Sequence, residues 1–62
     1  MMAQITAKEL TALDDMMGME SVLVAKYQEN ANQTSDAALK DCYTQMAQRH
    51  QRHFDELYSN LK

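Results

Sequence analysis

Apolar side chains recur at alternating spacings of three and four along the first half of the chain, which is the spacing that lines one face of a helix. The polar residues between these positions fall on the other side of the helix. The series predicts an amphipathic helix over about residues 7–31. Its members are Leu10, Leu13, Met17, Glu20, Val24, Tyr27 and Ala31.

The predicted helix has a recognisable beginning and end. Thr6 and Glu9 have the spacing of a capping box, in which each side chain accepts a hydrogen bond from the backbone N–H of the other. Polar cap-forming residues occupy about positions 32–36. Within them, Asn32 is predicted to be a left-handed C-terminal cap, and Ser35 or Asp36 the N-cap of the next helix.

A second helix is predicted over about residues 37–60. Its apolar face carries Leu39, Cys42, Tyr43, Met46, His50, His53, Phe54, Leu57 and Leu61. Two helices of roughly 25 residues, each about 37 Å long, joined by a short turn predict an antiparallel hairpin. Because no strand-like alternation accompanies them, the expected fold is all-α, with one helical-hairpin domain across residues 1–62.

The small size of the chain points to self-association. A chain of 62 residues buries only about 60% of its unfolded surface. Its single cysteine cannot form an intrachain disulfide. The predicted hairpin also has no third layer to cover its apolar face, so we expect a homodimer in which two hairpins form a four-helix bundle. The alternative is a monomer whose apolar face binds a helix of another protein.

Gly18 is the one glycine of the chain, and it falls inside the first predicted helix. It shares a helical face with Ser21 and Ala25, which would allow a second helix to approach closely. The alternative is a surface glycine that the helix tolerates at a cost of about 1 kcal/mol relative to alanine.

Charge and hydropathy exclude several classes of partner. The net charge of −3 argues against general nucleic-acid binding. No stretch approaches the ~18–20 apolar residues of a membrane helix, and the first residues lack the basic start and apolar run of a signal peptide. Together with a single cysteine, these features lead us to expect a cytoplasmic location, unless the resemblance described below places the protein in a spore coat.

Glu20 is the exceptional member of the first apolar series. An ionised carboxylate in a core costs free energy unless a cationic group or a metal ion binds it. Folding the hairpin about residue ~34 brings Glu20 opposite positions 48–49, near His50 and His53. Imidazole and carboxylate suit zinc, iron, manganese or copper. The candidate metal ligands are therefore Glu20, His50 and His53. The alternative is a hydrogen-bonded polar layer that includes His50, His53 or Tyr27 of a neighbouring chain.

Two other chemistries are weaker candidates. Cys42 and Met46 share a face with the two histidines, which would suit copper(I), although such residues at helical spacing also serve as core filler. Cysteine-based catalysis is not expected, since Cys42 lies two turns from His50 and is predicted to be buried. The sequence shows no catalytic set, and we do not expect an enzyme.

Glu20, Tyr27 one heptad later, and a histidine ending an i, i+3 pair on the next helix resemble the ferritin-like pattern. In that pattern one helix supplies a Glu and its neighbour supplies Glu-x-x-His. His53 matches the family histidine, but His50 stands at the position of the second Glu. With a single core carboxylate per chain, the resemblance implies a poorer di-iron site and an adequate mononuclear site for zinc, iron or copper.

The whole chain looks more like the short spore coat protein F family of this superfamily. A helix rich in Leu and Met with a central Glu is similar to that family, as is the cap at residues 35–40, which lacks the family's Pro and Glu. The resemblance covers about Lys8 to Leu61. It implies a four-helix bundle and a structural or assembly role in a spore coat, with other coat proteins as partners.

Overall fold

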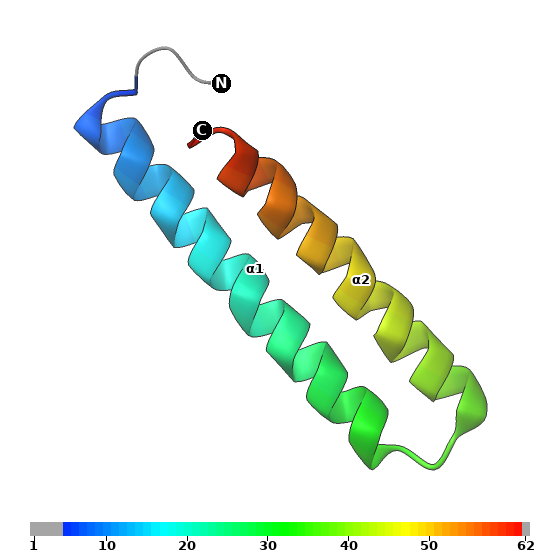
Figure 1. Ribbon diagram of the computed structural model, residues 1–62. Helices are drawn as coiled ribbons and strands as arrows, with labels where there is room; N and C mark the ends of the chain where they lie inside the picture. The colour runs from blue at the N-terminus through cyan, green and yellow to red at the C-terminus, as the bar shows by residue number, and fades with distance from the viewer. Residues whose placement is uncertain (1–4, 62) are drawn as a thin grey trace.

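The computed structural model describes residues 5–61 as two long helices joined by a short turn (Figure 1). Helix α1 spans Ala7–Gln33 and helix α2 spans Ala37–Ser59. They run antiparallel along each other, and no strand occurs between residues 5 and 61. The hairpin measures 47 Å along its long axis and 17 by 10 Å across. The predicted all-α helical hairpin is confirmed.

The beginning of α1 is the predicted capping box. The Glu9 backbone N–H donates to Thr6 Oγ1 at 3.1 Å, and the Thr6 backbone N–H donates to Glu9 Oε1 at 3.1 Å. Hydrogen bonds from Thr6 hold the pKa of the Glu9 carboxyl below its ordinary value. The bond from the Thr6 backbone has the larger effect, and the bond from its side chain adds to it. The cap therefore favours the ionised carboxylate.

We expect the contribution of Glu9 to stability to be lost in acid. A carboxyl group whose pKa is lowered by folding stabilises the folded state above its unfolded pKa, and this contribution disappears as the pH falls through the folded pKa. Thermal unfolding of the native chain and of Glu9→Gln, followed by circular dichroism across this range, measures the effect. The native chain should melt at the higher temperature near neutral pH, and the gap should narrow in acid. A gap independent of pH would contradict the prediction.

The turn differs from its prediction. Asn32 is helical, because α1 continues to Gln33, and no residue from 5 to 61 has a positive φ. The predicted left-handed cap at Asn32 is therefore wrong. Instead, Thr34 takes an extended conformation (φ −85°, ψ 141°) while its N–H donates to the Asn30 carbonyl at 3.1 Å. Its hydroxyl then accepts a hydrogen bond from the Asp36 N–H at 3.2 Å. The C-terminal cap of α1 is therefore Thr34 in an extended conformation, not Asn32 in a left-handed one.

Asp36 is the N-cap of α2. Its carboxylate accepts a hydrogen bond from the Leu39 backbone N–H at 3.0 Å. Of the two candidate caps, Ser35 and Asp36, the structure thus selects the residue that also places a negative charge at the positive end of the helix dipole. The helix ends at Ser59, one residue before its predicted limit.

Very little of the hairpin is buried. Among residues 5–61 the buried hydrophobic side chains are Leu13, Ala31 and Ala47. Several members of the predicted apolar faces are instead exposed, because each helix has only one neighbour and that neighbour covers only a narrow stripe. The exposed members are Leu10, Leu39, Cys42, His53 and Leu61. Met16, next to the series member Met17, is 40% exposed.

Gly18 does not mediate a close approach of α2. A Cβ built at this position would meet no atom within 4 Å beyond the helix's own nearby backbone. We expect Gly18→Ala to raise the free energy of unfolding by about 0.5–1 kcal/mol, because alanine loses less backbone entropy in a helix. Urea denaturation measures the change, and Ala25→Gly, on the same face, is the reciprocal control. A loss of stability in Gly18→Ala would show that another copy packs against this glycine.

Candidate functional site

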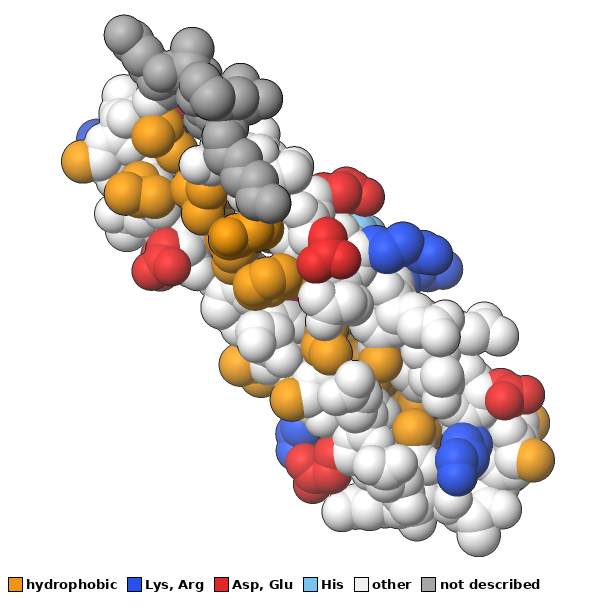
Figure 2. Space-filling view, in the orientation of Figure 1, with side chains coloured by type: hydrophobic (Ala, Val, Ile, Leu, Met, Phe, Trp, Pro, Cys, Tyr) orange, Lys and Arg blue, Asp and Glu red, His pale blue; other side chains and the backbone are white. Residues whose placement is uncertain are grey.

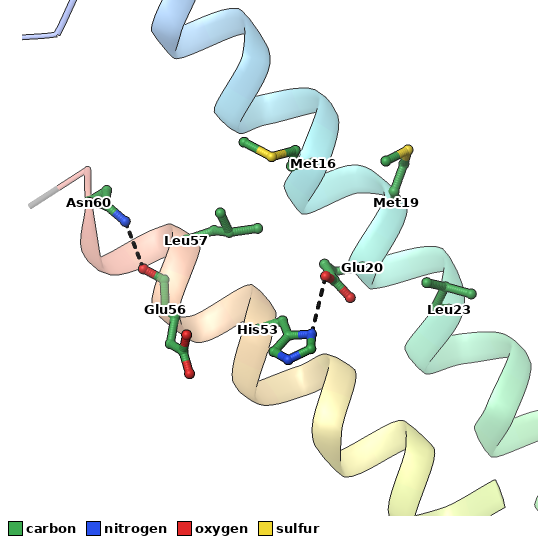
Figure 3. A pocket seen from close by; sticks show the side chains of 8 residues that line it. All are labelled: Met16, Met19, Glu20, Leu23, His53, Glu56, Leu57 and Asn60. Carbon is green, nitrogen blue, oxygen red and sulfur yellow. Dashed lines mark hydrogen bonds and ion pairs between the residues drawn. The ribbon is translucent and has the colours of Figure 1, made fainter.

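Glu20, His50 and His53 meet where the two helices face each other. Glu20 is the fourteenth of the 27 residues of α1, at its midpoint, and the two histidines lie one turn apart on α2. Glu20 Oε1 is 2.5 Å from His50 Nδ1, and Glu20 Oε2 is 3.5 Å from His53 Nδ1. Figure 3 shows Glu20 of α1 and His53 of α2 pointing toward each other across the gap. The predicted register, with Glu20 opposite these two imidazoles, is confirmed.

The two oxygens of one carboxylate contact two different imidazoles. When Nδ1 of His50 carries a proton, it donates a short hydrogen bond to Glu20 Oε1. The 3.5 Å separation of His53 Nδ1 from Oε2 is too long for a good hydrogen bond. Glu20 therefore has one close partner and one that stands slightly apart.

The three side chains of the site differ in their exposure to solvent. The side chain of His50 is 17% exposed and that of Glu20 is 19% exposed, whereas that of His53 is 45% exposed. Glu20 was expected in the interior, and the hairpin shields most of its side chain. The His53 edge remains open to solvent, so a small ion can reach the carboxylate from that side.

Aromatic rings hold His50 in place from the turn side. The ring of Tyr27 stacks on His50 with a centroid separation of 5.7 Å and an interplanar angle of 8°. Tyr43 packs beside Tyr27 at 6.3 Å, and His53 meets His50 edge-on at 5.5 Å. Stacked rings restrict the rotation of one another. Tyr27, considered earlier as a neighbouring chain's hydrogen-bond donor to Glu20, here supports His50 of its own chain.

An apolar groove adjoins the site on the His53 side. It has a volume of about 470 Å³, and most of its wall is hydrophobic. Figure 3 shows its lining from both helices: Met16, Met19, Glu20, Leu23, His53, Glu56, Leu57 and Asn60. The polar lining residues are Glu20, His53, Glu56 and Asn60, and the rest of the wall is apolar.

Cys42 does not belong to this site. It is exposed, so the prediction that it is buried is wrong. Among the described residues, the side chains that place ligand atoms within 4.8 Å of one another are Glu20, His50 and His53. The candidate copper(I) set of Cys42, Met46 and the histidines is therefore not assembled, because the Cys42 sulfur is not among these neighbouring ligand atoms.

Comparison with known proteins identifies no relative. No protein-family model matches the chain, and neither the curated proteins nor the solved structures include a significant match. In residues 5–61, neither helix has the length and apolar character needed to cross a membrane.

Proposed function

We propose that the protein is a small structural protein that assembles as a homodimer, in which two hairpins close into a four-helix bundle. The observation that carries this proposal is that the hairpin buries three hydrophobic residues among those described and leaves many more exposed. Large hydrophobic residues that remain exposed are Leu10, Met16, Met19, Val22, Leu23, Leu39, Tyr58 and Leu61.

The exposed residues line both helices on faces that a second hairpin can cover. In Figure 2 hydrophobic side chains follow the α1 side of the molecule for much of its length. The groove beside Glu20 takes apolar walls from both helices, with Met16 and Leu23 from α1 and Leu57 from α2. Two helices alone supply too little buried area for a stable small domain. A two-fold axis through the middle of this face would bury the grooves of both copies together.

A second copy fits this face better than a single foreign helix does. The two helices of the hairpin are similar in length, with 27 and 23 residues. A second hairpin therefore matches the whole face from the turn to the open end, and it places both Glu20 residues at the middle of the bundle. This arrangement agrees with the ferritin-like four-helix architecture that the sequence resembles.

The resemblance to the spore coat protein F family gives the proposal its biological setting. A bundle of two hairpins suits an assembly or coat-associated role, in which surface-to-surface contacts are the function. The partners we propose are a second copy of the chain and other coat proteins. This assignment depends on the cap at residues 35–40 and the central Glu20.

Sedimentation equilibrium over a wide concentration range tests the dimer. We expect a mass of twice 7.1 kDa at micromolar concentration, with unfolding that shifts to higher temperature as the concentration rises. A folded monomer at all concentrations would overturn the proposal and would favour the module that binds a partner helix.

A further inference from the structure

We propose that Glu20, His50 and His53 form a binding site for a divalent transition metal of the zinc class. All three ligands come from one chain, so the site goes beyond the proposed dimer and does not depend on it. Two imidazoles and one carboxylate are a common ligand set for zinc sites that keep an open position.

The ligand atoms lie close to the separations that a tetrahedral ion needs. Bonds of about 2.0–2.1 Å from a tetrahedral metal place neighbouring ligand atoms about 3.3 Å apart. Glu20 Oε2 and His53 Nδ1, at 3.5 Å, already have this separation. Glu20 Oε1 and His50 Nδ1, at 2.5 Å, need to separate by less than about 1 Å, which a small side-chain rotation supplies. All three residues offer ligand atoms within 4.8 Å of one another.

A simple hydrogen-bonded pair explains only half of this arrangement. One imidazole satisfies a carboxylate oxygen, and His50 does so with a short contact. His53 is too far from Oε2 for a good hydrogen bond, yet its Nδ1 is directed at the same carboxylate. Two Nδ1 atoms therefore converge on one carboxylate, which is the arrangement that three ligands of one metal ion adopt.

The surroundings favour an ion with one exchangeable ligand. Tyr27 stacks on His50 and limits its rotation, so one ligand is oriented before the metal arrives. His53, with 45% of its side chain exposed, lies at the entry to the site. A fourth position would face the groove beside Met16 and Leu57, where water can complete the tetrahedron.

Titration of the untagged full-length chain with Zn²⁺, and with Co²⁺ for its visible absorption, tests the site. Both histidines of the chain belong to the proposed ligand set, so other imidazoles do not compete. A Cys42→Ser background removes the exposed thiol, which is the other strong zinc ligand. We expect one metal per chain, with a tetrahedral Co²⁺ spectrum that lacks a thiolate band. Binding should occur in the dimer and in a dissociated monomer alike.

Matched variants separate this site from adventitious binding. Changes to groups that merely orient a ligand already weaken metal binding about 10- to 100-fold. Glu20→Gln, His50→Ala and His53→Ala should therefore each weaken it by about a hundredfold or more. The control is Glu56→Gln, which removes a carboxylate from the same groove and should leave affinity unchanged. A folded native chain that binds no stoichiometric Zn²⁺ or Co²⁺ would overturn the proposal, and so would an equal loss in Glu56→Gln.

Discussion

Replacing Leu13 with alanine is expected to lower the free energy of unfolding by about 2–3 kcal/mol. Leu13 is the one large hydrophobic residue among residues 5–61 that is buried, with only 9% of it exposed. Truncation of a buried leucine removes its transfer free energy and leaves a cavity, at a cost that commonly reaches 2–5 kcal/mol. The lower part of this range applies because Leu13 lies near the open end of the hairpin, where the surrounding residues can move to fill the cavity.

Leu10→Ala is the matched control for Leu13→Ala. It makes the same change one turn earlier in the same helix, but Leu10 is 47% exposed. Urea denaturation at one fixed protein concentration compares the two variants, since the stability of a dimer depends on concentration. We expect Leu10→Ala to cost less than Leu13→Ala, because only the second copy of the proposed dimer can cover Leu10. Equal losses would show that the dimer buries Leu10 as fully as the hairpin buries Leu13.

Replacing Leu23 with lysine is expected to raise the dissociation constant of the dimer by about a hundredfold or more. Leu23 lines the groove and is 38% exposed in the hairpin, so a lysine there can reach water when the chain is a monomer. In the proposed dimer the same position lies between four helices, where an unpaired charge is strongly disfavoured. A hundredfold change corresponds to about 2.7 kcal/mol.

Gln45→Lys controls for the added charge. Gln45 is exposed on α2 and does not line the groove, so it receives the same charge outside the proposed interface. Sedimentation of both variants gives the dissociation constants, and circular dichroism shows whether helix is retained. A Leu23→Lys chain that remains dimeric at the same concentrations as Gln45→Lys would place the interface on another face.

The sequence predicts the hairpin and its register well because both depend on local, repeated signals. The helices follow from apolar spacing, and their starts from the side chains of Thr6 and Asp36, which bond the backbone of the next turn. Once the turn is placed near residue 34, antiparallel pairing fixes which residues face Glu20. Counting places Glu20 opposite positions 48–49, and the apolar face of the second helix then points to His50 and His53, which Glu20 contacts.

The predictions that were wrong concern how deeply residues are buried and the backbone conformation of the turn. Helical spacing identifies an apolar face, but it does not say how much of that face one neighbouring helix covers, which is why Leu10 and Cys42 are exposed. Ala47 was missed because alanine carries little hydrophobic signal. Its spacing from Tyr43, His50 and Phe54 is the pattern that could have revealed it as a point of close helix contact.

The hairpin brings the start of α1 and the end of α2 to the same end of the molecule (Figure 1). A single polypeptide in which a linker joins two copies of the chain would therefore show the direction of the two-fold axis in the proposed dimer. If the axis runs parallel to the helices, a few glycine and serine residues would join two copies into one folded polypeptide. If it runs perpendicular, the ends to be joined lie about the full 47 Å apart, and a linker needs about 14 extended residues.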